Sequence, residues 1–313
     1  MRSFLLKRLA LAIPTLLLLS AITFLVGSLA PSDPATTILR ERATPEAVAR
    51  LRHELGLDRP LWRQYLDYVG HVCQGDFGIS YYDRRPVLET LAETYPETAR
   101  LAGYAILLSL LLGVPLGLSA AACQDRWVDR LAMGVAVVGV SLPSFVLGSL
   151  LILVFAQVLG WLPVAYTGRP LELLLPALAL GSRPAALIAR ITRASVLEAL
   201  RQDYVRTALA KGLSRTRALL GHALRNALVP ILTVVGVSTG YLLAGSFVVE
   251  SVFVIPGIGR LSLDAITRRD YPVLQAVTLL GASAFVLVNL LVDVAYACVD
   301  PRVRSGMAAN ERD

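Results

Sequence analysis

Long apolar runs restrict this chain more than any other feature, because they are long enough to cross a lipid bilayer. Of its 313 residues, 55% are hydrophobic and only 17% are charged, which is too apolar for an ordinary soluble domain. A helix of about 20 apolar residues spans the hydrocarbon core. We therefore predict an all-α integral membrane protein with six transmembrane helices, at residues 9–30, 98–122, 131–159, 171–191, 228–249 and 273–298.

Glycine and proline add detail to several of these spans. Residues 113–117 and 236–240 both have a G-x-x-x-G spacing, which lets two helices approach closely in lipid. Pro143 predicts a kink in the third span. The first span ends at residues 28–30, which resemble a signal-peptidase site. That run is about twice as long as the core of a typical signal peptide, so we interpret it as a retained anchor.

The polar stretch at residues 31–96 predicts a small helical domain outside the membrane. Thr44 has the features of an N-cap followed by proline, and Gly56 closes the helix that it begins. A second helix is expected at residues 60–72. Its apolar face consists of Trp62, Tyr65, Leu66 and Val69. Residues 86–93 are expected to form an interfacial helix that leads into the second span.

A basic segment, residues 198–230, separates the fourth span from the fifth. Its cations are Arg201, Arg206, Lys211, Arg215, Arg217 and Arg225, and its acids are Glu198 and Asp203. A basic loop between two spans is what the positive-inside rule alone would produce. The pattern within the segment leaves a second interpretation open, in which it docks on another protein.

This second interpretation rests on a predicted helix, a glycine joint and a second helix. The stripe of the first helix consists of Val205, Leu209 and Leu213, which recur every four residues. Ala208 and Gly212 form a line beside that stripe, where another backbone could approach closely. Gly212 is also placed to end the helix, and Ser214 to cap the next one.

Basic residues in the short loops predict the orientation. The N-terminal stub, the turn at residues 123–130, the basic segment and the tail are rich in Arg and Lys, which indicates that both termini are cytoplasmic. Residues 31–96 then face outward. The predicted division is a stub and first span at 1–30, an extracytoplasmic domain at 31–96, a membrane core at 97–300 containing a cytoplasmic loop at 196–228, and a tail at 301–313.

Motifs for several other functions are missing from the sequence. There is no phosphate-binding G-x-x-x-x-G-K-[ST], so we expect no ATP site in this chain, and no catalytic constellation or metal site is recognisable. The basic residues lack the aromatic interleaving of a nucleic-acid surface. The cysteines, Cys73, Cys123 and Cys298, are odd in number and far apart, so no disulfide framework is implied.

Two ionisable residues lie inside apolar runs, where charge is costly and therefore informative. Arg183, beside Pro184, is a candidate for a cation that faces the transport pathway, with a structural ion pair as the alternative. Asp293 is a candidate for a structural ion pair with Arg190 or Arg193.

The basic segment contains two consecutive motifs, Tyr204-Val205-Arg206-Thr207-Ala208-Leu209-Ala210-Lys211-Gly212 and Arg225-Asn226-Ala227-Leu228-Val229-Pro230. Together they resemble the EAA loop of ABC-importer permeases, in the variant of the dipeptide, oligopeptide and nickel group. The similarity extends through most of the chain, to Gly56-Leu57-Asp58-Arg59-Pro60, Gly75-Asp76-Phe77-Gly78, Ser141-Leu142-Pro143, Val249-Glu250 and Asp300-Pro301-Arg302. Arg206 and Thr207 stand where the family at large has Glu and Ala, so a glutamate contact to an ATPase is not carried over.

The resemblance implies a type I ABC importer fold in the bacterial plasma membrane. It also implies a second homologous permease subunit, two ATPase subunits that bind ATP and Mg²⁺, and an extracytoplasmic substrate-binding protein, with no cofactor on this chain. The implied ATPase-coupling residues are Tyr204, Arg206, Ala208, Leu209, Lys211 and Gly212.

The substrate class is the least determined part of this prediction. Di- and oligopeptides are expected, and glutathione or a nickel–metallophore complex is the alternative within the family. An ion-coupled secondary transporter would need acidic residues in the middle of its spans, and none supports that alternative.

Overall fold

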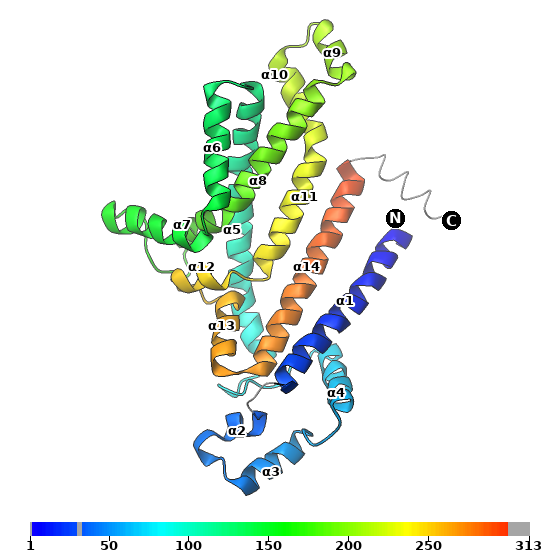
Figure 1. Cartoon of the computed structure of the whole chain (residues 1–313), viewed down its shortest axis with the longest axis vertical. Coiled ribbons are helices and arrows are strands. Elements are labelled where there is room, and N and C mark those ends of the chain that lie inside the picture. Colours follow the sequence, from blue (N-terminus) through cyan, green and yellow to red (C-terminus); the bar gives the residue numbers. More distant parts are fainter. Residues whose placement is uncertain (1, 30–32, 300–313) are drawn as a thin grey trace.

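The computed structural model describes residues 2–29 and 33–299, and its regular elements are helices (Figure 1). The predicted tail at 301–313 and the motif Asp300-Pro301-Arg302 lie outside the described residues. The helices are α1 (Arg2–Leu29), α2 (Pro34–Leu39), α3 (Pro45–Glu54), α4 (Leu61–Cys73), α5 (Val87–Ala122), α6 (Trp127–Ser141), α7 (Ser144–Leu151), α8 (Leu174–Leu200), α9 (Asp203–Ala210), α10 (Arg215–Ala218), α11 (Leu224–Leu243), α12 (Phe247–Val252), α13 (Ile258–Arg268) and α14 (Tyr271–Val299). The stretches Ile152–Val158 and Leu219–Ala223 are π-helical, and Pro170–Leu173 is a 3₁₀ turn.

Among the described residues, five helices are long and apolar enough to cross a membrane, and a bent pair is a sixth candidate. The bent pair corresponds to the predicted third span, because α6 and the stretch Ser144–Val158 meet at 106°. Leu142 is extended (φ −80°, ψ 128°), as is favoured before proline, and Pro143 cannot donate a backbone hydrogen bond. The predicted kink at Pro143 is confirmed, but as a break, so residues 131–159 are not one continuous helix.

The predicted interfacial helix at 86–93 is wrong. Val87 begins α5, a single helix of 36 residues that continues through the second span. Val87 and Leu91 in its first turns are buried in one apolar cluster with Ile258 of α13 and Val273 of α14. This packing holds the start of α5 in line with the rest of the helix instead of leaving it free to lie along the surface.

The most extensive helix contact joins α5 to α8, the most buried of the candidate spans. A Cβ atom at Gly113 would lie 2.6 Å from the carbonyl oxygen of Ala185, and Gly117 stands equally close to Ala189 one turn further along. Gly236 of α11 similarly faces α14. The predicted close helix contact at both G-x-x-x-G spacings is therefore confirmed, because a side chain at Gly113 or Gly117 would meet the backbone of α8, and one at Gly236 would meet the Val292 side chain of α14.

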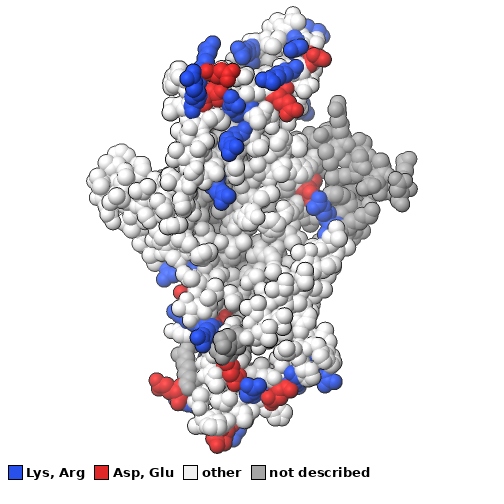
Figure 2. Space-filling view, in the orientation of Figure 1, with Lys and Arg blue, Asp and Glu red and all other residues white. Residues whose placement is uncertain are grey.

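Charged side chains gather at the two ends of the bundle, and only a few lie along its middle on the face that Figure 2 shows. One end holds α9 and α10, and the other holds α2, α3, α4, α12 and α13 (Figure 1). The sequence predicts that both termini lie on the same side as the basic segment. The structure agrees, because α1 begins and α14 ends toward the end of the molecule that holds α9 (Figure 1).

The segment after α1 matches the sequence prediction in two helices. Thr44 caps α3, with its hydroxyl accepting from the Ala47 amide at 3.3 Å, and Gly56 follows this helix at φ +67°. Helix α4 is the predicted second helix. The short helix α2 was not expected from the sequence, and the ion pair between Arg52 and Asp33, at 3.1 Å, joins it to α3.

Gly113→Ala is expected to lower the thermal unfolding midpoint of the detergent-purified protein. The added methyl group has no room beside the Ala185 carbonyl, and overpacking of this kind costs about 1–3 kcal/mol. Gly103→Ala is the matched control on the same helix, because a Cβ atom there meets nothing within 4 Å. Equal midpoints for the two variants would contradict the assigned contact.

Candidate functional site

Helix α9 is the short helix that the basic segment predicts. It runs Asp203–Ala210 and ends in a glycine turn, with Gly212 at φ +89°. The amide of Gly212 donates to the carbonyl of Leu209 at 2.9 Å, and that of Leu213 donates to Ala208 at 3.2 Å. Glycine adopts this left-handed conformation without the steric cost that a Cβ atom brings, so the residue type follows from the backbone.

The chain then turns directly into the next helix. Ser214 caps α10 by accepting from the amide of Arg217 at 3.4 Å. Helix α10 continues through the π-helical stretch into α11, so that Arg215–Leu243 forms one candidate span. The predicted order of helix, glycine joint and second helix is confirmed.

The predicted apolar stripe of α9 is only partly buried. Val205 is fully buried, whereas Leu213 is half-buried and Leu209 is 38% exposed to solvent. Ala208 is half-buried, and Gly212 borders open space. Helix α9 is therefore held to its own chain through Val205 and leaves a small, mixed face uncovered at the extreme end of the molecule (Figure 1).

Tyr204 ties α9 to the helix that follows it. Its hydroxyl accepts a hydrogen bond from the side-chain amide of Asn226, and its ring lies 6.4 Å from that of His222, edge to face. The sequence prediction grouped Tyr204 with the residues that contact an ATPase and did not foresee this internal bond. Both residues belong to the quoted motifs, but nothing in their 22-residue separation indicates that they meet.

The cations of α9 remain available to a partner. Arg206 lies 4.0 Å from Asp203, and both side chains are strongly exposed, at 74% and 98%, so this pair contributes little stability. Lys211 is exposed and has no ion pair within the part of the chain that the structure describes. The uncovered end therefore presents positive charge beside a small apolar surface.

Arg183 lies on the single uncovered stripe of α8. Arg183, Arg190, Ala194 and Glu198 are exposed at helical spacing, while the opposite faces pack on α5 and α6. Arg183 has no ion pair or hydrogen bond among the described residues. The structural alternative for this arginine, an acid on another helix of the same chain, is thus not found in the described part of the protein.

The predicted partners of Asp293 are wrong. Asp293 of α14 lies 3.2 Å from Arg8 of α1. Arg193 instead forms a two-pronged pair with Asp129 of α6, at 2.6 and 2.7 Å, and Asp129 is only 3% exposed. Arg190 is exposed and pairs with neither Asp293 nor Asp129. The reason is the packing order, since α11 lies between α8 and α14 and keeps their side chains apart (Figure 1).

A buried carboxylate organises the outer end of the bundle. Glu250 is fully buried on α12 and accepts from the hydroxyl of Thr98 at 3.1 Å, the amide of Ser246 at 3.2 Å and the amide of Arg260 at 3.0 Å. The last donor belongs to the first turn of α13, where a negative charge is favourable. Glu250 belongs to the motif Val249-Glu250, but nothing in that motif indicates that the side chain is buried or which groups it binds.

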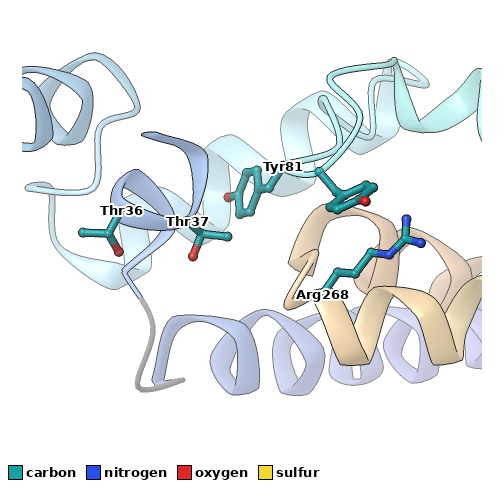
Figure 3. A pocket seen from close by; sticks show the side chains of 5 residues that line it. Thr36, Thr37, Tyr81 and Arg268 are labelled. Atoms are coloured by element: carbon teal, nitrogen blue, oxygen red, sulfur yellow. The ribbon is translucent and has the colours of Figure 1, made fainter. Parts of the chain in front are cut away.

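An open pocket of about 350 Å³ lies at the same end, lined by Thr36, Thr37, Tyr81, Tyr82 and Arg268. Figure 3 shows the two threonines on the side opposite Arg268, with Tyr81 between them. Burial raises the pKa of Tyr81 to about 12, so this phenol stays neutral at physiological pH. The guanidinium of Arg268 lies 3.9 Å from the ring centre of Tyr82. The pocket therefore offers hydroxyl groups and a cation.

Within the described ranges, no three His, Cys, Asp or Glu side chains are grouped as a metal site requires. Cys73 and Cys123 are free thiols, and the side chain of Cys298 is not among those that the structure describes.

Comparisons with known proteins agree along the whole chain. Residues 113–305 match the family described as "Binding-protein-dependent transport system inner membrane component", and residues 1–102 match the N-terminal region of such membrane components. The glutathione transport system permease protein GsiC of Salmonella typhimurium is 46% identical over 304 residues, which is 97% of this chain and 99% of GsiC. GsiC of Escherichia coli K12 is 45% identical over the same length.

Solved structures show the same fold at much lower identity. The chain matches a subunit of the MetNI methionine ABC transporter, in an inward-facing conformation, with a TM-score of 0.58 and 17% identity, over 68% of this chain and 97% of that one. The chain therefore belongs to the binding-protein-dependent inner membrane component family: it is the permease subunit of an ABC importer of the peptide and nickel group, a multi-pass protein of the plasma membrane and a transport component rather than an enzyme.

Proposed function

We propose that this permease imports glutathione or a short peptide closely related to it. The supporting observation is that relatives named as glutathione permeases share 45–46% identity over 97% of the chain. Glutathione, a tripeptide with two carboxylates, was the alternative substrate in the sequence prediction, and these relatives favour it over the di- and oligopeptides expected first. The exposed Arg183, in the middle of a span, would supply a cation for one of these carboxylates.

The coupling of transport to ATP hydrolysis is assigned in this proposal to α9. The helix projects from the end of the bundle, and its free surface contains both small residues and cations. The residues proposed to contact or position an ATPase are Tyr204, Arg206, Ala208, Leu209, Lys211 and Gly212. Because α9 is bonded through Tyr204 to Asn226, a push on α9 would reach α11 as well as α8, and rigid spans would convert it into alternating access.

The proposed assembly contains a second homologous permease subunit, most simply as a heterodimer, whose interface with this chain encloses the uncovered stripe of α8. Two ATPase subunits would bind ATP and Mg²⁺, and this chain would bind neither. The extracytoplasmic substrate-binding protein would dock at the outer end, where α13, Arg268 and the pocket face outward.

The cognate binding protein is expected to prefer glutathione to its α-linked isomer, Glu-Cys-Gly. The isomer has the same atoms and charge, but its first carboxylate and its amine are displaced by the change of linkage. We expect isothermal calorimetry to give at least tenfold weaker binding for the isomer, which corresponds to about 1.4 kcal/mol. Binding of the isomer alone would remove glutathione as the proposed substrate, and equal affinities would contradict the expected preference and favour short peptides in general.

Gly212→Glu is expected to abolish transport and substrate-stimulated ATP hydrolysis while the chain inserts normally. A glutamate at φ +89° is strained by about 1–2 kcal/mol, and its carboxylate alters the charge of the docking face. Gly221→Glu is the control, because it adds the same charge nearby at an exposed glycine without positive φ. The measurement is ATPase activity of the reconstituted complex, and full stimulation in Gly212→Glu would count against the assignment.

Arg183→Ala is expected to raise the KM for uptake about tenfold, the loss of about 1.4 kcal/mol of carboxylate binding, with unchanged assembly and basal ATPase activity. Arg183→Lys retains the charge and should show a smaller increase in KM. Uptake into proteoliposomes and co-purification of the subunits measure the two effects separately. A failure to assemble, without a separate defect in uptake, would instead assign Arg183 a structural role.

A further inference from the structure

Helix α4 contacts α1 at a point deep inside the apolar run of α1. The hydroxyl of Tyr65 donates to the carbonyl of Leu17 at 2.9 Å and lies 2.9 Å from the hydroxyl of Ser20. Leu17 precedes the outer end of α1 at Leu29 by 12 residues (29 − 17), which is about 18 Å at 1.5 Å per residue. The hydrocarbon core is about 30 Å thick, so this hydroxyl contact lies near its middle. The ring that carries the hydroxyl packs on Phe24, only 5 residues (29 − 24), or about 7.5 Å, from the same end, so α4 itself lies beside the outer half of the core.

An aromatic cluster holds α4 in this place. Phe24 of α1 lies 5.5 Å from the ring of Tyr65 and 5.8 Å from that of Tyr68, measured between ring centres. Ser20 is only 5% exposed beneath α4. Figure 1 shows α4 beside the outer part of α1 and separate from α2 and α3. Helix α4 is therefore packed along the first span, although it belongs to the stretch that the sequence assigns to water.

A second apolar face of α4 has no cover in the described protein. Trp62 and Leu66 are each 59% exposed, and they adjoin the face that Tyr65 and Tyr68 turn toward α1. Val69 lies half-buried between the two faces. The apolar surface of α4 is thus wider than its contact with α1 requires.

The polar residues of α4 occupy the remaining side of the helix. Arg63, Asp67 and His71 recur there at helical spacing and are exposed. Asp67 pairs with Arg59 at 3.1 Å, and the guanidinium of Arg63 lies 5.0 Å from the ring centre of Trp62. A tryptophan with a long cation folded over it, on a helix with a distinct polar side, is the arrangement of helices that lie in the membrane interface.

We propose that α4 is embedded in the outer leaflet, with Trp62 and Leu66 in contact with lipid acyl chains. The stretch at residues 31–96 is then divided between two media. Helices α2 and α3 lie in water, and α4 anchors them to the bilayer and to α1. This anchor would hold the outer end of the permease at a set height above the membrane for the binding protein that docks there.

Photo-crosslinking tests which molecule covers this face. The photoreactive residue benzoyl-phenylalanine replaces Leu66 or, separately, Trp62, in the full chain co-expressed with its partner subunits. The same residue at His71 is the matched control, because it lies on the polar side of the same helix. The same residue at Leu18, which is 64% exposed in the middle of α1, is a control for the depth of the membrane. Membranes are irradiated, and adducts of this chain are identified by mass spectrometry.

The expected result is a phospholipid adduct at positions 62 and 66 and none at position 71. An adduct to a second permease chain or to the binding protein would overturn the proposal and identify the true neighbour. The absence of any adduct at 62 and 66, together with a lipid adduct at 18, would place the face in water and overturn it as well. Chain abundance in the membrane and ATPase activity of the complex confirm that each variant is folded.

Discussion

The contact between α5 and α8 is the interaction on which the rest of the bundle depends. Lipid offers no hydrophobic drive for one helix to bind another, so association relies on close packing. Gly113 and Gly117 let α5 approach the backbone of α8 directly, beside the carbonyls of Ala185 and Ala189. Helix α8 is then surrounded by α5, α6, α7 and α11, and a single stripe of it stays uncovered. That stripe is where Arg183 lies.

Buried carboxylates determine how the segments outside this core are attached to it. Glu250 accepts hydrogen bonds from α5 and from the first turn of α13. Asp270 accepts from the hydroxyl of Ser80 and from the amide of Tyr81 at 3.1 Å, and so joins the segment before α5 to the start of α14. At the opposite end, Asp129 holds Arg193. Each of these carboxylates is almost completely buried. A buried donor left without its acceptor would cost free energy, so these hydrogen bonds hold the segments in place.

Local features of the sequence were sufficient to predict most of the long helices and several of their ends. They did not predict the short helices α2, α12 and α13, and the fifth span, predicted at 228–249, ends at Leu243 because the chain turns there into α12. The length of each apolar run is imposed by the thickness of the bilayer, and the cap at Thr44, the left-handed turn at Gly212 and the break at Pro143 each depend on a few neighbouring residues. These predictions are confirmed because the energies that decide them act within one or two helical turns. The prediction of a separate helix at 86–93 is wrong because burial of Val87 and Leu91 against distant helices favours a continuous α5.

What the sequence determined by itself was the helical membrane fold, the approximate spans, and the helix–glycine–helix form of the basic segment. Only the tertiary structure decided which charges pair. An arginine attracts any acid that lies near it, and the packing order of the helices determines which acid that is. Arg193 therefore pairs with Asp129, and Asp293 with Arg8. The bond between Tyr204 and Asn226 and the packing of α4 against α1 have the same origin. These contacts join residues that are far apart in the sequence, and a local sequence pattern reports only on residues within one or two helical turns of each other.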